Sequence, residues 1–499
     1  MKGDFSRDSF DPLRLRHYSR VLQQQGRVEL DADGNERQAI QLHHLRSLAK
    51  DLIGPQGGPW AGTGFEIVPA DDGNGKALPQ DFLIRMGHYY VDGWLCENDA
   101  DVRYYAADKG SPSQPWLPKP VELLRGKTYL AYLDVWERHV CAAEVDDGTD
   151  IASPYALREV ALGGPDTTTR AQVVWQVKVD FGDGAPPLPQ ANPTPAGWAT
   201  WMNSNWAAWR ALWQPEARGL LKAKAADTTD ADSGNPCVIS PQSRYRGLEN
   251  QLYRIEIHRG GVVGVVGVVS VSDKTQPTFV WSRENGSVVF AVERLNDCSV
   301  KLVEGWRDAR FGLAVGDVVE ISYEDTVLSG AAGSLVRVTG VDLDTLTISF
   351  EAGSLTSPVD ASRHAVLRRW DHGHRKTATA PGKDAKEGRP IIANDLALTL
   401  TERIWLTIED GISVFFEAAT QSEQQHYRTG DYWLIPARTA IGDVLWPRST
   451  DGPLAQEPHG VEHHYAPLAI VTVDGDNGAV KISSEPARRF KSLVELSKP

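Results

Sequence analysis

Cysteine, excess positive charge and long apolar runs are all scarce in this chain of 499 residues. Its four cysteines lie far apart and form no CxxC pair. That spacing excludes a zinc ribbon and a small disulfide scaffold, and it favours buried thiols in a protein made in the cytoplasm. The longest apolar run, residues 260–271, is rich in glycine and too short to span a bilayer.

The charge balance is acidic, with 66 Asp and Glu against 52 Lys and Arg and a net charge of -14. Because this composition predicts no basic face, we expect the protein to bind neither nucleic acid nor an anionic membrane surface. Residues 1–20 are polar and charged, which predicts no signal peptide. We therefore expect a soluble protein that is neither exported by the general route nor inserted into a membrane.

A chain of this length is expected to divide into several units. Recurring short β-rich runs predict a mainly β fold, with antiparallel sheets and small barrels, an N-terminal helical arm and a short central helical insertion. The expected segments are a docking arm and helix (1–56), a first β domain (57–185), a proline-rich linker with a tryptophan-rich helical insertion (186–236), a β segment with a glycine- and valine-rich excursion (237–292), a small SH3-like or OB-like barrel (293–375) and a C-terminal β domain (376–499).

Turn dipeptides predict three hairpins within these β segments. Asp92-Gly93, Asn285-Gly286 and Asp410-Gly411 each lie between aromatic and β-branched runs, and these dipeptides favour the tight turns that join antiparallel strands. Between residues 252 and 258 the residue types alternate, which predicts a half-buried strand.

Two helices are expected near the start of the chain. Residues 13–25 have roughly helical apolar spacing, Gly26 ends them, and Val28 and Leu30 alternate like a brief strand. A second helix should begin near Asp33 or Asn35, both suitable caps, and end before Gly54.

The second helix would carry an apolar stripe along one face. Such a stripe must be buried, either against this chain's own β domain or against a neighbouring subunit. Its members are Ile40, His44, Leu45, Leu48 and Leu52.

The central insertion is rich in tryptophan, at spacings that place the indoles along one side of a helix. We interpret this stripe as packing, either in the core or between subunits. The alternative is a sugar-stacking platform, which would make the protein a carbohydrate-binding or carbohydrate-cleaving surface module. The stripe consists of Trp198, Trp201, Trp206, Trp209 and Trp213.

One string resembles a catalytic motif. His459, Glu462 and His463 match HxxEH, in which a helix presents both imidazoles to one zinc ion. Pro458 and Gly460 disfavour that helix, so hydrogen-bonding histidines in a loop are the preferred interpretation. We expect no metal, cofactor or catalytic residue. The remaining alternative is an enzyme that a larger particle carries as cargo.

The opening of the chain carries a family resemblance. It reads MKGDFSR, then FDP, then VLQQQGRVELDAD. These strings resemble the N-terminus of an uncharacterised family encoded with bacterial contractile injection systems, which are phage-tail-like particles. More loosely, they are similar to the regions by which tail-fibre and baseplate proteins attach. The chain departs from the pattern at Gly34, where the family has tryptophan.

The resemblance implies a structural, non-enzymatic subunit in a baseplate-peripheral or fibre-like position, docked through its N-terminal segment. Its expected partners are baseplate, sheath or spike proteins and further copies of itself, as a trimer by analogy with tail fibres. The particle would assemble in the cytoplasm before release. The expected interface residues are Phe5, Phe10, Tyr18, Val21, Gln25, Gly26, Val28 and Leu30.

Overall fold

The computed structural model divides into two compact units, each built from three stretches of chain. Unit 1 comprises Met1–Asp4, His139–Arg170 and Glu216–Val461, and unit 2 comprises Phe5–Arg138, Ala171–Pro215 and Glu462–Pro499. The structure describes residues 1–6, 17–71, 77–105, 112–145, 157–162, 164, 166–189, 193–214, 219–225, 245–262, 276–306, 308–355, 364–373, 387–417, 426–483 and 487–491.

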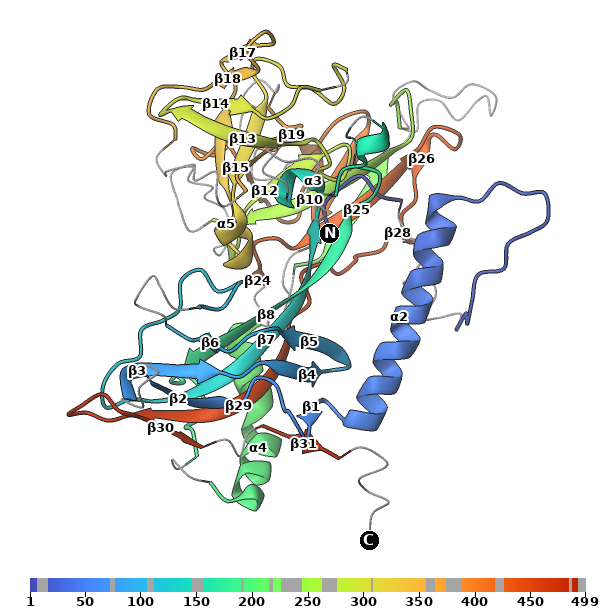
Figure 1. Cartoon of the computed structure of the whole chain (residues 1–499). Coiled ribbons are helices and arrows are strands. Elements are labelled where there is room, and N and C mark those ends of the chain that lie inside the picture. Colours follow the sequence, from blue (N-terminus) through green and yellow to red (C-terminus); the bar gives the residue numbers. More distant parts are fainter. Residues whose placement is uncertain are drawn as a thin grey trace. The chain divides into compact units, whose positions relative to one another are not determined.

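The fold is mainly β with few helices, as the sequence predicts (Figure 1). The units do not follow the six consecutive segments expected from the sequence, because each unit joins strands from distant parts of the chain.

Unit 2 is organised around a four-stranded sheet in the order β30-β29-β7-β8. Two smaller sheets, β31-β1-β4-β5 and β2-β3-β6, share one apolar core with it. The elements are α2 (Asp31–Ile53), β1 (Gln56–Pro59), β2 (Ile67–Asp71), β3 (Ala77–Ile84), β4 (Gly87–Val91), β5 (Trp94–Asn98), β6 (Val102–Arg103), β7 (Thr128–Val140, whose last two residues belong to unit 1), β8 (Arg170–Asp180, whose first residue belongs to unit 1), α4 (Pro195–Trp213), β29 (His464–Val473), β30 (Val480–Ser483) and β31 (Arg489–Phe490).

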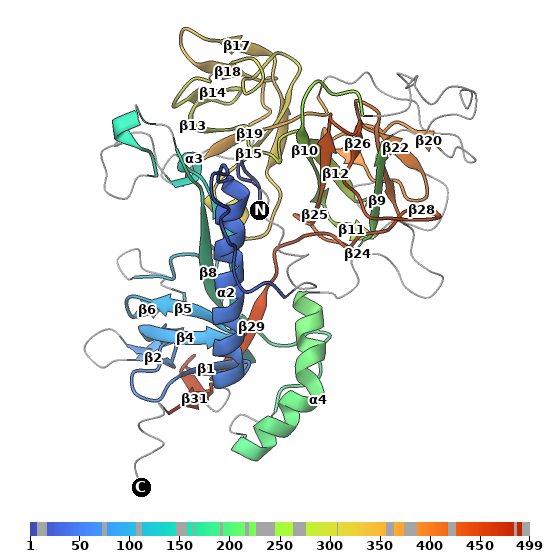
Figure 2. The same cartoon turned by 90° about the vertical axis from the view of Figure 1, so that its right-hand side faces the viewer.

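Unit 1 contains a sandwich and a half-barrel. The sandwich pairs the sheet β21-β12-β10-β25-β26 with the sheet β20-β22-β23-β9 around one apolar core (Figure 2). A seven-stranded sheet, β16-β15-β19-β13-β14-β18-β17, encloses a second core as the half-barrel.

The elements of unit 1 are mostly short strands. They are α3 (Ala142–Val145), η1 (Val160–Leu162), β9 (Leu221–Ala225), β10 (Gln251–Arg259), β11 (Gly261–Val262), β12 (Thr278–Ser282), β13 (Val289–Asn296), β14 (Ser299–Leu302), β15 (Val318–Ser322), α5 (Glu324–Leu328), β16 (Ser334–Arg337), β17 (Gly340–Asp342), β18 (Thr347–Ser349), β19 (Val366–Trp370), β20 (Glu387–Gly388), β21 (Leu398–Thr399), β22 (Trp405–Thr407), β23 (Ile412–Phe416), β24 (His426–Tyr427), β25 (Tyr432–Arg438), β26 (Asp443–Val444), β27 (Arg448–Ser449) and β28 (Gly452–Pro453).

Two of the three predicted hairpins form. Asp92 and Gly93 join β4 to β5, and Asp410 and Gly411 join β22 to β23, with positive φ at all four residues. The hairpin predicted at Asn285-Gly286 is wrong, because β12 pairs with β10 and β21 whereas β13 pairs with β14 and β19. The turn has the expected positive φ values but leads from one sheet into another.

The N-terminal arm differs from the prediction. Residues 17–30 contain neither the expected helix nor the strand at Val28 and Leu30, and the remainder of the predicted helix lies outside the described residues. A short helix needs a surface against which to bury its apolar side, whereas Tyr18, Val28 and Leu30 in the described part of the arm are exposed.

The second predicted helix is present as α2 and ends, as expected, just before Gly54. It begins at Asp31 with Leu30 as the N-cap, three residues before Asp33, the nearer of the two predicted caps. Asp33 lies inside the first turn, where its carboxylate accepts a hydrogen bond from the Leu30 N–H at 3.1 Å.

Candidate functional site

Three parts of the structure carry the candidate site residues: helix α2 and the Asp134–His463 pair in unit 2, and a polar centre in unit 1 that holds residues 1–3.

Helix α2 contacts the β4–β5 hairpin through charged side chains. The Arg46 guanidinium lies 3.3 Å from the centroid of the Trp94 ring and bonds the Glu137 carboxylate at 3.1 Å. Lys50 pairs with Asp92 at 3.0 Å. These contacts fix the polar side of α2 against the β4–β5 hairpin and β7.

The leucine face of α2 is exposed in the part of the chain that the structure describes. Leu45, Leu48 and Leu52 share this face at spacings of three and four, and their exposed fractions are 63%, 57% and 74%. Ile40 is the one buried residue of the helix. Burial of the expected stripe against this chain's own β domain is therefore restricted to Ile40.

The expected interface residues in the arm are mostly open to solvent. Tyr18, Val28 and Leu30 are exposed hydrophobic residues, and the neighbouring Leu22 is exposed as well. Gln25 and Gly26 are exposed, Phe5 and Val21 are half-buried, and Phe10 lies outside the described residues. The exposed hydrophobic residues of the arm and those of the leucine face lie on the surface of the described residues.

The HxxEH string forms no helix. Residues 459–463 are irregular or extended, and His459 belongs to unit 1 whereas Glu462 and His463 belong to unit 2. Neither unit contains all three of His459, Glu462 and His463. Among the described residues, no group of three or more His, Cys, Asp or Glu is placed to hold a metal ion.

His463 instead contacts a buried carboxylate. Its Nδ1 lies 2.7 Å from Asp134, which also pairs with the Lys178 ammonium at 2.7 Å. Burial alone would raise the pKa of Asp134, but Lys178 and His463 outweigh burial and lower it. The imidazole also lies against the Trp136 ring, with centroids 4.9 Å apart. Asp134 is thus a buried anion that is paired with Lys178 of β8 and with His463, which directly precedes β29.

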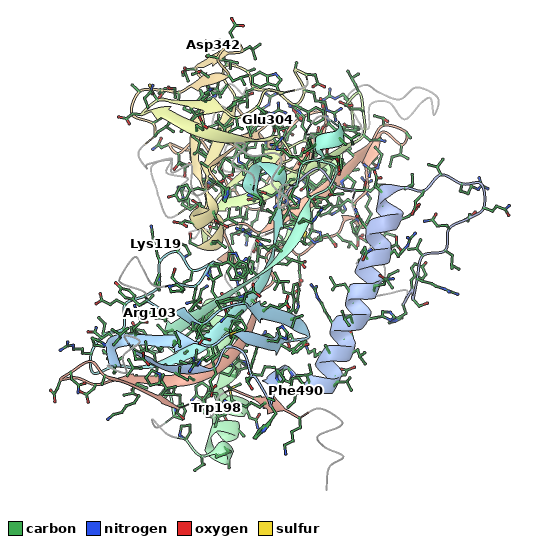
Figure 3. All side chains as sticks on the ribbon, in the orientation of Figure 1. Arg103, Lys119, Trp198, Glu304, Asp342 and Phe490 are labelled. Carbon is green, nitrogen blue, oxygen red and sulfur yellow. The ribbon has the colours of Figure 1, made fainter. Side chains whose placement is uncertain are left out.

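The tryptophan stripe lies on α4, where Figure 3 labels Trp198. Trp198, Trp201 and Trp209 are buried against Leu130 of β7 and Ile470 of β29. Trp206 and Trp213 are half-buried beside them, and Trp213 stacks on Tyr132 at 3.7 Å. The stripe is therefore packing within unit 2.

The proline-rich segment before α4 takes part in this packing. The carbonyls of Pro186 and Pro187 accept the indole N–H groups of Trp209 and Trp201, at 3.0 and 2.8 Å. A stretch that reads as a linker in the sequence thus supplies hydrogen-bond acceptors to the helix that follows it.

The polar centre of unit 1 was not predicted from the sequence. Strand β10, expected to be half-buried, is buried on both faces over its central residues. Arg254 and Glu256 lie side by side on it, and the Arg254 Nε donates to Glu256 at 2.5 Å. The Arg254 guanidinium stacks on the Tyr432 ring, 3.5 Å from its centroid.

The turn at Asn285 completes this centre. The Asn285 side-chain oxygen accepts a hydrogen bond from Arg254 at 3.1 Å, and its backbone N–H donates to the Leu252 carbonyl. Residues 1–3 lie against these groups, with Met1 and Gly3 bonded to Arg254 and Asn285. The sequence places Arg254 and Glu256 on one side of the strand and Tyr253, Ile255 and Ile257 on the other, a pattern that normally indicates a solvent-facing polar side.

The comparisons give one match. Residues 1–186 and 201–498 match a family described as "Family of unknown function (DUF6519)". No curated protein and no solved structure gives a significant match to the chain. Neither α2, α4 nor any other described helix has the length and apolar content needed to cross a bilayer.

Proposed function

We propose that this chain, which belongs to the DUF6519 family of unknown function, is a structural, non-enzymatic subunit of a contractile injection particle. It docks onto other particle subunits through its N-terminal arm and α2. The proposal rests on the resemblance of the MKGDFSR and QQGRVELDAD strings and on one structural observation, the exposed leucine face of α2.

The leucine face is suited to a partner of complementary shape. Full burial of a leucine side chain contributes about 1.5–3 kcal/mol, so Leu45, Leu48 and Leu52 together offer several kcal/mol to an interface. A helix that presents leucines at these spacings is the form recognised by an apolar groove. The polar contacts of Arg46 and Lys50 fix the helix before the partner arrives, which lowers the ordering cost of binding.

The buried tryptophans of α4 offer no exposed aromatic surface for sugar stacking, which the alternative carbohydrate-binding function would need. Trp201 and Trp209 are almost wholly covered and donate their indole N–H groups to backbone carbonyls. A sugar ring stacks on an open aromatic face, which these two side chains lack.

Sedimentation of a native-host lysate through a density gradient, with blotting for this protein, tests the proposal. We expect the protein to co-migrate with megadalton tail-like particles. If it stays entirely in the soluble fractions, the proposal is wrong.

A variant pair identifies the docking face. L45E/L52E should release the protein into the soluble fractions, because two charges would enter an apolar interface. It should change the free energy of unfolding by no more than about 0.5 kcal/mol, since both leucines are exposed in the free chain. L248E is the matched control, because Leu248 is fully exposed on unit 1, away from α2 in sequence.

A further inference from the structure

Residues 1–3 lie in unit 1 as a short peptide bound through its backbone. The Gly3 N–H donates to the Asn285 carbonyl at 3.1 Å, and the Asn285 side-chain amide donates to the Gly3 carbonyl at the same distance. Arg254 donates to the Met1 carbonyl at 2.8 Å. The amino nitrogen of Met1 donates to the Tyr432 hydroxyl. These bonds hold the peptide in one register.

The second position of the peptide is recognised by charge. The Lys2 ammonium lies 2.6 Å from a carboxylate oxygen of Glu256, whose side chain is 7% exposed. It also lies over the Trp370 ring, 5.5 Å from the centroid. A buried carboxylate beside an aromatic face favours a cationic side chain over a neutral one.

The charge balance of the site requires this cation. Two buried carboxylates, Glu256 and Glu320, lie close enough to interact, and Arg254 directly pairs with the first of them. Burial alone would raise the pKa of Glu256, but Arg254 and Lys2 together lower it to about 2. Lys2 likewise helps to lower the pKa of Glu320. Without Lys2 the site would retain an uncompensated buried negative charge.

The third position accepts only glycine. Gly3 has φ of +151°, and a Cβ atom there would overlap the imidazole ring of His139. The walls themselves belong to unit 1 and bond one another independently of the peptide, through the contacts of Arg254 with Glu256, Asn285 and Tyr432. The site is thus built to receive a lysine followed by glycine.

We propose that unit 1 contains a binding site for a Lys-Gly peptide segment, and that the Met1–Gly3 segment of a second copy of this chain can occupy it. The chain passes from unit 1 into unit 2 between Asp4 and Phe5, so residues 1–4 are a short segment of unit 1 that continues directly into unit 2. The contacts are the same whichever copy supplies the segment. Exchange of such a segment links copies at little cost in contacts. This proposal does not depend on the proposed function.

A peptide titration tests the site. The full chain carrying Lys2→Glu has a disabled segment and an intact site. It should bind a fluorescently labelled Met-Lys-Gly-Asp-Phe-Ser peptide saturably, by fluorescence anisotropy, and bind the peptide with glutamate at position 2 at least about tenfold more weakly. Equal binding of both peptides, or binding of neither, would overturn the site. If the variant does not fold, restoration of its native circular dichroism by the lysine peptide alone supports the site, and no restoration overturns it.

Mixing two complementary variants tests exchange between copies. K2E has an intact site, and E256K has an intact segment. A mixture should form a complex of one chain of each, seen by sedimentation velocity, because the segment of E256K fills the site of K2E. Each variant alone should have a lower mass. If the lysine peptide binds K2E but the mixture forms no complex, exchange between copies is refuted while the site remains. If E256K does not fold, the wild-type chain is mixed with K2E instead. The negative control is a mixture of K2G/G3V with K2E. The wild-type mixture must then contain a larger fraction of complex than the control mixture.

Discussion

Gly3 combines a backbone conformation reserved for glycine with a close neighbour. Gly3→Ala should lower the free energy of unfolding of unit 1 by about 1–3 kcal/mol, since the alanine is strained and its methyl group meets His139. Urea unfolding measures this change. Gly26→Ala is the matched control, because Gly26 also has positive φ but nothing within 4 Å of its Cβ position. Equal effects of the two substitutions would show that His139 moves aside.

Two buried histidines of unit 1 make its stability depend on pH. Burial lowers the pKa of His139 and of His372 to about 4 each, from an ordinary value of 6.5. Between pH 4 and 6.5 the unfolded chain therefore binds more protons than the folded chain, and stability is lost as pH falls through this window. Each histidine contributes a slope of about 1.4 kcal/mol per pH unit.

His372→Gln should reduce this slope by the share of one histidine. Glutamine keeps a donor near the position of His372 Nε2, which lies 2.9 Å from the Leu396 carbonyl, but it does not titrate. Urea midpoints between pH 4.5 and 7.5, converted with measured m-values, give the slope. The two slopes should converge above about pH 7, where neither state protonates the imidazole. An unchanged slope at low pH would contradict the buried neutral histidine.

Residue types predicted some local roles and missed others. Asp33 was expected as an N-cap, but Leu30 holds that position and Asp33 accepts the Leu30 N–H from within the first turn of α2. Arg254 and Glu256 alternate with apolar residues, which normally indicates a solvent-facing side. They are buried because they neutralise each other and Lys2, and a partner more than 250 positions away cannot be found from local alternation.

The turn dipeptides predicted backbone angles better than they predicted which strands pair. All three Xaa-Gly dipeptides adopt positive φ, yet two of them join paired strands and the third joins two sheets. The dipeptide determines the backbone angles of two residues, whereas pairing depends on which strands lie beside the flanking segments. Asn285 is held by Leu252 and Arg254 of β10, and this contact replaces a hairpin partner.

Helix α4 offers a test of packing against ligand binding. Trp209 is fully buried and bonds Pro186, while Trp206 is half-buried on the same helix. Trp209→Ala should destabilise unit 2 by about 3–5 kcal/mol, and Trp206→Ala should cost clearly less. Thermal unfolding followed by tryptophan fluorescence measures both. If both substitutions reduced stability by similar small amounts and also abolished binding to a glycan array, the carbohydrate interpretation would be restored.

The whole molecule is assembled from contacts that skip most of the chain. Strand β29 pairs with β7, and β9 pairs with β23, so segments expected to belong to separate domains far apart in the chain lie in shared sheets. Composition and periodicity report how one segment is patterned, and they carry no information about which distant strand supplies its partner. This is why the fold class could be predicted, whereas the assembly of the two units could not.

The separate cores predict two unfolding transitions. Among the described residues, the core of unit 2 shares no member with the two cores of unit 1, whereas a smaller cluster of Val280, Trp370 and Ala397 joins the sandwich to the half-barrel. Because cooperativity follows shared burial, differential scanning calorimetry should resolve two peaks. Trp209→Ala should lower the temperature of one peak, and His372→Gln at pH 5 should shift the other. A single peak that both substitutions move alike would show that the two units unfold as one cooperative body.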